Sequence, residues 1–200
     1  MSRPTVIYLH GFASGFNGDS PKTGMIQRLG YPLLWALTDG DYTPAGYQRA
    51  VAALNLDLAR PLVFMGTSLG GFWARELGNR WGKPWIALNP ALHPQRTLAP
   101  HTGTLPRYDN GALFTWTAAD NAAYAHWPRA VIRPEIPGLI IVAEDDDTIP
   151  FQDTLPEVGT AELLVLPQGG HPLHNTEDFE PLVARFLEQQ GHYSRMAGST

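Results

Sequence analysis

The 200-residue chain contains no cysteine. This absence excludes a disulfide framework, catalysis by a thiol and metal sites built on cysteine, and it fits a cytoplasmic protein. Charged residues make up only 16% of the chain, and a net charge of −5 favours neither nucleic acid nor an anionic membrane as a partner. The apolar run at residues 5–10 is far too short for a signal peptide or a membrane span. We therefore expect a cytoplasmic protein that binds neither nucleic acid nor membranes.

The rest of the composition is that of a folded globular protein. Apolar residues make up 44% of the chain, which argues against disorder. Two hundred residues are enough for one domain with a substantial core and few for two. Because the chain also shows no internal repeat and no linker, we expect a single domain over residues 1–200, as a monomer or a small homo-oligomer.

Short apolar runs, each bounded by proline, glycine or a charged residue, recur along the chain. Most are continuously apolar, which is typical of strands buried on both faces. Segments of helical character separate them, and this alternation predicts an α/β fold with a six-stranded, mainly parallel sheet and helices on both faces. The predicted strands are residues 5–10, 32–37, 61–65, 84–88, 138–143 and 161–166.

Four segments have the signals of helices. Ser20 and Pro21 form the start of one helix, and Thr43 and Pro44 repeat the same signal for a second helix whose apolar face includes Leu58. We expect the last ten residues to form a mobile tail. The predicted helices are residues 19–30, 43–59, 69–81 and 175–190.

Residues 92–136, which we call the 92–136 segment, have no clear period. The segment is either a long surface excursion packed by its own aromatic side chains or a small cap over a pocket, and the sequence leaves both open. If it is a cap, Trp116 and Trp127 are candidates for the wall of that pocket. Its large aromatic residues are Tyr108, Phe114, Trp116, Tyr124 and Trp127.

Ser68 stands between a predicted strand and a predicted helix. Together with Gly66 and Gly70 it matches G-x-S-x-G, the nucleophile elbow, in which a tight turn lifts the serine hydroxyl clear of the backbone. Strand and helix approach closely there, so the residues two before and two after the serine must be small. The amide of Leu69, at the start of the helix, points to where an oxyanion would form. The alternative is a structural Gly-Ser-Gly turn.

A serine nucleophile needs a base, and the base needs a carboxylate to orient it. Residues 144–147 read Glu-Asp-Asp-Asp and follow the fifth predicted strand, while His171 and His174 follow the sixth. This gives the order serine, acid, histidine that the elbow requires. The rival interpretations are a solvated acidic turn, a metal site and a histidine held by backbone hydrogen bonds. Because we see no well-spaced metal ligands, we expect no metal.

The first predicted strand ends in His10, Gly11 and Phe12. A glycine-containing loop at this position can offer a backbone N–H to an oxyanion. We assign that donor to Phe12, with Leu69 as the second donor and Gly11 as part of the same substrate-binding loop. We expect His10 to organise the loop through hydrogen bonds rather than to transfer protons.

Four strings in order resemble the YqiA-like esterases, small members of the α/β-hydrolase superfamily: "IYLHGF" (7–12), "SPK" (20–22), "GTSLGGFWA" (66–74) and "LNPA" (88–91). The resemblance covers about the first ninety residues. It implies a minimal hydrolase fold, Ser68 as nucleophile, and activity on short acyl esters or thioesters.

The acid and histidine segments depart from this family. The family's acid lies in a G-D-E-like segment, whereas this chain reads Ala-Glu-Asp-Asp-Asp at residues 143–147. The family's histidine follows G-G-x, whereas here residues 169–171 read Gly-Gly-His. The wider superfamily pattern G-x-x-D-x-x-V-P maps onto residues 143–150 and selects Asp146, with Asp145 and Asp147 as alternatives.

We therefore predict a serine esterase or thioesterase with Ser68, His171 and Asp146 as its triad and no cofactor, acting on a small acyl ester or thioester. The alternatives are amide or carbon–carbon bond hydrolysis on the same triad, or a binding protein with little turnover.

Overall fold

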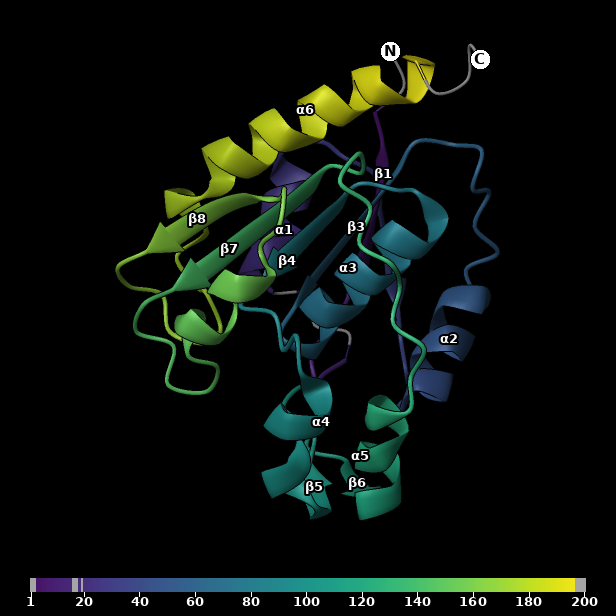
Figure 1. The fold of residues 1–200 in the computed structure, drawn as a ribbon, viewed down its shortest axis with the longest axis vertical. Helices are drawn as coiled ribbons and strands as arrows, with labels where there is room; N and C mark the ends of the chain where they lie inside the picture. The colour runs from purple at the N-terminus through teal and green to yellow at the C-terminus, as the bar shows by residue number, and fades with distance from the viewer. Residues whose placement is uncertain (1–2, 16–17, 19, 197–200) are drawn as a thin grey trace.

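A computed structural model describes residues 3–15, 18 and 20–196. Its central sheet has six strands in the order β2-β1-β3-β4-β7-β8, and every neighbouring pair is parallel (Figure 1). The prediction of a six-stranded, mainly parallel sheet is confirmed. The strands are β1 (Thr5–Leu9), β2 (Leu33–Ala36), β3 (Leu62–Thr67), β4 (Trp85–Leu88), β7 (Gly138–Ala143) and β8 (Glu162–Leu166).

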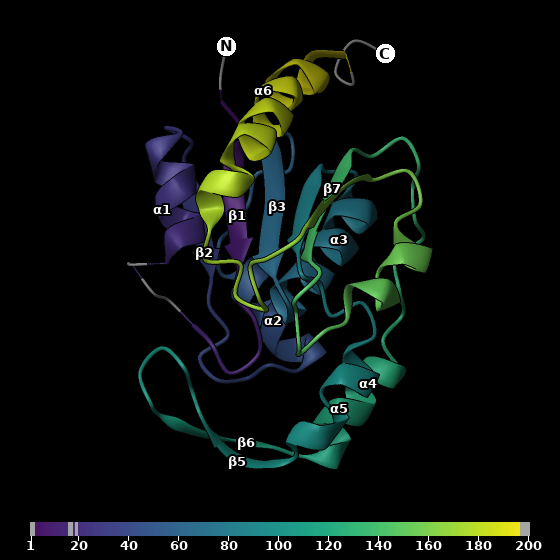
Figure 2. The same cartoon turned by 90° about the vertical axis from the view of Figure 1, so that its left-hand side faces the viewer.

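Helices cover both faces of the sheet because successive side chains of each strand point to opposite sides. In β7, Ile140 and Val142 join the core that includes α2 and α3, while Leu139 and Ile141 join the core that includes α1 and α6. Figure 2 shows α1 and α6 on one side of the sheet and α3 on the other. The helices are α1 (Pro21–Arg28), α2 (Pro44–Ala52), α3 (Leu69–Trp81) and α6 (Glu180–Met196).

The predicted second helix is wrong beyond Ala52, where α2 ends. Its start follows the sequence, because the Thr43 side chain accepts a hydrogen bond from the amide of Gly46 at 3.1 Å. Its end does not, because Asn55 turns into the left-handed region with φ of 48°. Leu58 therefore leaves the predicted apolar face, and 39% of its surface is exposed.

The last helix lies further along the chain than predicted. A short 3₁₀ turn, η4 (Thr176–Asp178), precedes α6, and Pro181 lies in the first turn of α6, where its missing N–H costs no intrahelical hydrogen bond. The expected tail is wrong as far as Met196 because the helix continues to that residue. Residues 197–200 lie outside the described residues.

The 92–136 segment contains regular elements that the sequence did not indicate. Figures 1 and 2 place them below the carboxyl ends of the central strands. Their role as a cap over a pocket stays a prediction. They are α4 (Pro94–Thr97), the 3₁₀ turn η1 (Ala99–His101), an antiparallel hairpin of β5 (Gly103–Pro106) and β6 (Leu113–Trp116), and α5 (Ala118–Ala125).

Helix α3 anchors the end of this segment. Glu76 is buried, and its carboxylate accepts hydrogen bonds from Arg129 Nε at 2.7 Å and from the amide of Ala130 at 2.8 Å. Three residues further along α3, Asn79 Oδ1 accepts a hydrogen bond from the amide of Arg133 at 2.8 Å. The chain that returns to β7 is therefore held against the helix that begins directly after Ser68.

The strand order reverses direction between β1 and β3. From β1 the chain passes to β2 on one side, and all later strands of the sheet lie on the other side. Ligands of open α/β sheets bind outside the carboxyl ends of the strands at such a reversal. The loop with Gly11 and Phe12 follows β1, and Ser68 follows β3, so both lie at this position. In the part of the chain that the structure describes, no helix is both long and apolar enough to span a bilayer.

Candidate active site

Ser68 occupies a sharp turn between β3 and α3. Its φ of 57° and ψ of −120° are a conformation that residues other than glycine rarely adopt. Neighbouring backbone holds it there, since the Ser68 amide donates to the Leu88 carbonyl at 2.9 Å and the Ala91 amide donates to the Ser68 carbonyl at 3.0 Å. The end of β4 therefore fixes the turn on both sides of the serine.

The two glycines around Ser68 allow strand and helix to meet. A Cβ built on Gly66 would lie 2.3 Å from the backbone of Gly70, and a Cβ on Gly70 would lie 2.0 Å from the carbonyl oxygen of Leu9. Neither distance leaves room for a side chain. The close approach that the G-x-S-x-G pattern predicts is therefore present, and it involves β1 as well as β3 and α3.

The sheet also brings Asp146 and His171 together. His171 Nδ1 and Asp146 Oδ2 are 2.9 Å apart, and the side chain of Asp146 is fully buried. The other carboxylate oxygen accepts the amides of Thr148 at 2.9 Å and Ile149 at 2.8 Å. An ionised carboxylate only accepts hydrogen bonds, so Nδ1 carries the proton and Nε2 of a neutral His171 has its lone pair free.

The neighbouring acidic residues have different partners. Asp145 Oδ1 accepts a hydrogen bond from the amide of Gly170 at 2.7 Å, and Asp147 Oδ1 accepts one from the hydroxyl of Thr148 at 3.2 Å. Glu144 is exposed. Of these four acidic residues, Asp146 alone is bonded to the ring of His171.

Ser68 and His171 are both described, and no hydrogen bond joins the serine hydroxyl to the imidazole in this structure. Catalytic hydrogen bonds of this kind are often long in unliganded enzymes and tighten when substrate binds. The structure thus brings together the predicted acid and base and places the predicted nucleophile on a strained turn at the same edge of the sheet.

Asn89 is a site residue that the sequence analysis missed. Its Nδ2 donates to the carbonyls of Gly170 at 2.9 Å and His171 at 3.0 Å, and its Oδ1 accepts the amide of Ala143 at 2.9 Å. It is buried and has a left-handed φ of 38°. Asn89 therefore connects the end of β4 to the end of β7, which precedes Asp146, and to the backbone of His171. The string "LNPA" contained it, but nothing in that string indicates partners more than fifty residues away.

The loop after β1 lies against the serine turn. A Cβ built on Gly11 would lie 3.5 Å from Ser68 Cβ and 3.3 Å from the carbonyl oxygen of Thr67. Leu69 is the first residue of α3, so its amide has no intrahelical acceptor. Among the described residues, no backbone carbonyl accepts a hydrogen bond from the amide of Phe12 or of Leu69. Both predicted oxyanion donors are thus without a backbone partner.

His10 organises this loop. Its Nδ1 donates to the carbonyl of Gly11 at 2.9 Å, and its Nε2 accepts the amide of Thr38 at 3.2 Å. Burial lowers the pKa of His10, which keeps the imidazole neutral. Because both ring nitrogens already have partners, His10 is unsuited to proton transfer, in agreement with its expected role.

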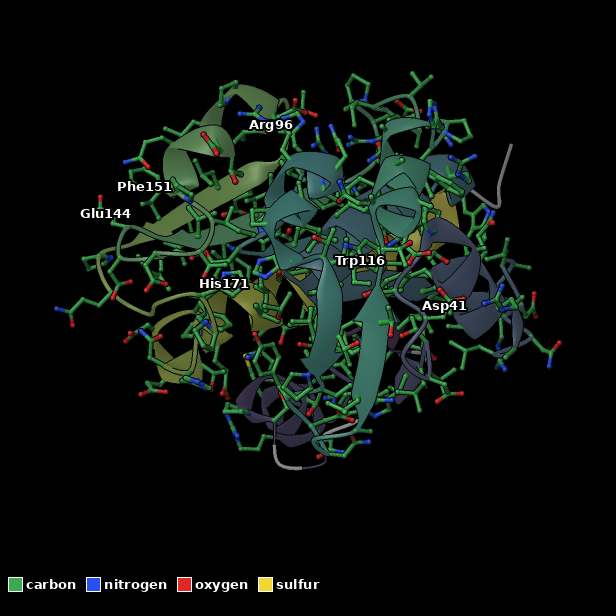
Figure 3. The ribbon with its side chains drawn as sticks, turned by 90° about the horizontal axis from the view of Figure 1, so that it is seen from below. Asp41, Arg96, Trp116, Glu144, Phe151 and His171 are labelled. Carbon is green, nitrogen blue, oxygen red and sulfur yellow. The ribbon has the colours of Figure 1, made fainter. Side chains whose placement is uncertain are left out.

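The hairpin of the 92–136 segment packs on Phe12. The Phe12 ring lies 5.4 Å from that of Phe114, 5.1 Å from that of Trp116 and 5.2 Å from that of Tyr42, measured between ring centroids. Figure 3, seen from below, shows Trp116 at the end of β6, in front of the sheet, with His171 on a separate loop. An aromatic cluster therefore covers the residue whose amide is the predicted oxyanion donor.

A surface cavity of about 690 Å³ lies beside the histidine loop (residues 169–175). Its lining includes His174 and Asp145 but neither Ser68 nor Phe12, so we do not assign it to the acyl group. Within the described ranges, no three histidine or acidic side chains converge in a way that could hold a metal ion.

Comparison with known families decides the identity of the chain. A family model described as "Uncharacterised protein family (UPF0227)" matches residues 5–188. The chain belongs to this family. UPF0227 is the YqiA family that the sequence motifs resemble. UPF0227 proteins of Yersinia pseudotuberculosis and Yersinia pestis are 29% identical over 101 residues, which are 47% of this chain and 54% of each relative. The chain thus spans about half the length of the curated relatives it matches.

Solved structures establish the fold of this UPF0227 member. Est1E from Butyrivibrio proteoclasticus superposes with a TM-score of 0.71 at 20% identity, covering 94% of this chain and 88% of Est1E. The mouse alpha/beta hydrolase domain-containing protein 10 gives a TM-score of 0.63 at 17% identity, covering 93% of this chain and 88% of the mouse protein. The chain therefore has the α/β-hydrolase fold, as predicted.

Proposed function

We propose that this protein is a serine hydrolase that cleaves short-chain carboxylic esters or thioesters. The observation that carries the proposal is the 2.9 Å contact between His171 Nδ1 and the buried carboxylate of Asp146. It occurs at the edge of the sheet where Ser68 adopts its strained turn. A buried carboxylate that orients an imidazole near a serine elbow supports nucleophilic catalysis, because each feature has a defined task in acyl transfer.

In the proposed reaction, Ser68 Oγ attacks the acyl carbonyl carbon while His171 Nε2 accepts the hydroxyl proton. Asp146 holds the imidazole in the tautomer that leaves Nε2 free and stabilises the imidazolium that forms. The amides of Phe12 and Leu69 donate to the oxyanion, and the N-terminus of α3 adds a favourable dipole. The imidazolium then protonates the alcohol or thiol leaving group, and water releases the acyl group from Ser68 by the same steps.

Short acyl groups suit the cover over the site. The hairpin places Phe114 and Trp116 against Phe12, and we expect this aromatic packing to limit the length of the acyl chain. The family resemblance also implies short acyl esters or thioesters. Esters and thioesters differ in the leaving atom rather than in the acyl group, so the same machinery serves both.

The test is covalent labelling with a fluorophosphonate, followed by intact mass, in parallel with hydrolysis of p-nitrophenyl esters. Wild type is expected to take up one label and to hydrolyse the esters. Ser68→Ala is expected to lose the label and to lose activity by roughly 10⁴-fold to 10⁶-fold. Ser14→Ala, in the loop after β1, is the matched control and keeps both.

A Ser68→Ala variant that kept a tenth of the activity would make Ser68 a structural turn residue and end the proposal. A panel of ester, thioester and amide substrates with one acyl group then separates the chemistries. A labelled Ser68 with no turnover on the whole panel would favour a binding protein.

A further inference from the structure

The chain has only two lysines, and one of them is buried in the fold. Lys22 lies on the inward face of α1 and is 7% exposed. Lysine is almost never fully buried without a partner, because taking an ammonium group out of water is costly. The cost is visible here, since burial lowers the pKa of Lys22 to about 8.

The partner of Lys22 is a backbone carbonyl beside the proposed base. Lys22 Nζ donates to the carbonyl oxygen of Pro172 at 2.6 Å, across 150 residues of sequence. In the described part of the chain, no carboxylate pairs with Lys22. A charged donor makes a hydrogen bond about twice as strong as a neutral one, so this contact holds the loop firmly.

Side chains hold three consecutive carbonyls of the histidine loop. Asn89 binds the carbonyls of Gly170 and His171, and Lys22 binds the next one, that of Pro172. The two side chains come from different elements of the fold. Asn89 follows β4, whereas Lys22 lies on α1, the helix that follows the Gly11–Phe12 loop.

Helix α1 has other attachments to the fold besides Lys22. Met25 and Ile26 are fully buried in the core shared with α6, and Arg28 is paired with Glu180 of α6 at 2.6 Å. A buried cation beside these contacts adds cost to the docking of α1. Its described hydrogen bond goes to the loop that carries His171, and this favours a role there.

We propose that Lys22 is a positioning residue, which locks the histidine loop against α1 and so fixes the height of the His171 ring above Ser68. This inference rests on the proposed function. The Lys22 hydrogen bond connects α1, which follows the loop of the proposed oxyanion donor Phe12, to the loop of the proposed base His171. Misplacement of a catalytic group by about 1 Å costs on the order of 10²-fold in rate.

The experiment compares Lys22→Met, Lys22→Arg and Lys83→Met with wild type. Methionine keeps the length of the side chain and removes the donor, while arginine keeps a cation with donors. Lys83 is the matched control because its Nζ also donates to a backbone carbonyl, that of Arg60 at 3.3 Å, away from the site. Folding of each variant is checked by circular dichroism and thermal melting.

Kinetics on p-nitrophenyl butyrate and amide hydrogen exchange of residues 169–175 are the two readouts. Lys22→Met is expected to lower kcat by roughly 10-fold to 100-fold with KM changed less than about twofold. It is also expected to speed exchange in the histidine loop. Lys22→Arg restores most of kcat, and Lys83→Met matches wild type in both readouts.

Wild-type kcat and unchanged exchange in folded Lys22→Met would overturn the inference and leave the proposed function intact. Equal losses in Lys22→Met and Lys83→Met would also overturn it, since they would indicate general destabilisation. Absence of both turnover and serine labelling in wild type would instead remove the proposed function, and faster exchange in Lys22→Met would then assign Lys22 to loop structure alone.

Discussion

Gly70 lies directly against Leu9, so closely that a Cβ on Gly70 would stand 2.0 Å from the Leu9 carbonyl oxygen. Leu9 ends β1 and leads into the Gly11–Phe12 loop, while Gly70 lies in the first turn of α3 after Ser68. This contact therefore sets the spacing between the serine turn and the proposed oxyanion donor.

Gly70→Ala is expected to lower the free energy of unfolding by about 3 kcal/mol or more, because the methyl group meets backbone that cannot move aside. Gly24→Ala is the matched control. Gly24 lies inside α1, and a Cβ built on it would meet only Arg28 Nη1, at 3.6 Å, so alanine there is expected to raise stability by about 0.5–1 kcal/mol. Urea denaturation measures both, and a Gly70→Ala variant as stable as wild type would contradict the close packing.

Asparagine substitutions separate the three neighbouring aspartates. Asp146→Asn is expected to lower kcat by roughly 10⁴-fold, because the amide cannot hold His171 in the required tautomer. Asp145→Asn and Asp147→Asn keep an acceptor oxygen for Gly170 and Thr148, so each changes kcat only a few-fold. Steady-state kinetics measure kcat for the three variants. A severe loss of kcat in Asp145→Asn or Asp147→Asn, with only a mild loss in Asp146→Asn, would reassign the acid.

His171→Ala is expected to abolish ester hydrolysis while His174→Ala retains it. His174 is exposed and lines the surface cavity beside the loop, whereas His171 is bonded to the buried acid. Fluorophosphonate labelling rates follow the same order, because the label needs an activated serine. An active His171→Ala variant with an inactive His174→Ala variant would exchange their roles.

Ester hydrolysis is expected to peak at short acyl chains and to fall before fatty-acid length. Each CH₂ that the site encloses adds up to about 0.8 kcal/mol, and one that protrudes adds almost nothing. Phe114→Ala shortens a side chain against Phe12 and is expected to move the optimum to longer chains. A series of p-nitrophenyl esters measures this.

Trp127→Ala is the control for that series. The sequence suggested Trp127 as a wall of the pocket, but its ring packs on Trp73 of α3 at 5.0 Å and its Nε1 donates to Glu76 at 3.3 Å. Its loss is therefore expected to lower stability and leave the chain-length optimum unchanged. Rates that climb steadily to long-chain esters in wild type would contradict the small pocket.

The pH dependence of stability is expected to differ between wild type and Lys22→Met. Burial lowers the pKa of Lys22 from its ordinary 10.5 to about 8. Between pH 8 and pH 10.5 the unfolded chain holds a proton on Lys22 that the folded chain does not. The free energy of unfolding of wild type is therefore expected to rise with pH over this range, compared with that of Lys22→Met. The gain is about 3 kcal/mol at most, and it is absent below pH 8. Urea unfolding from pH 7 to pH 10 measures it, and parallel curves would contradict it.

Short sequence patterns predicted those features of the fold that depend on a few neighbouring residues. The apolar runs located all six strands of the sheet, and the glycines around Ser68 located the turn whose crowding the structure shows. The superfamily pattern over residues 143–150 selected Asp146, the acidic residue that binds His171. In each case the signal lay within a few residues of the feature.

Contacts between residues far apart in the sequence could not be predicted from such patterns. Asn89 and Lys22 reach the histidine loop across 82 and 150 residues, and neither sequence neighbourhood indicates that partner. The hairpin of β5 and β6 was missed because most residues of its strands are exposed, so neither strand reads as a buried apolar run. The Phe114 ring of β6 packs on Phe12 and Tyr42 rather than on the sheet. The end of α2 depended on the left-handed turn at Asn55, which a run of helix-compatible residues did not predict.

The anchoring of the 92–136 segment makes its hairpin an exchangeable part. Glu76 and Asn79 hold the chain after α5, and neither contacts β5 or β6 through the hydrogen bonds described above. A designer could therefore replace residues 103–116 with a hairpin of another shape and leave the proposed triad residues in place. The graft would have to supply an aromatic neighbour for Phe12, in the place of Phe114 or Trp116, so that the loop after β1 keeps its support. The acyl selectivity of the proposed esterase is thus open to engineering by segment exchange.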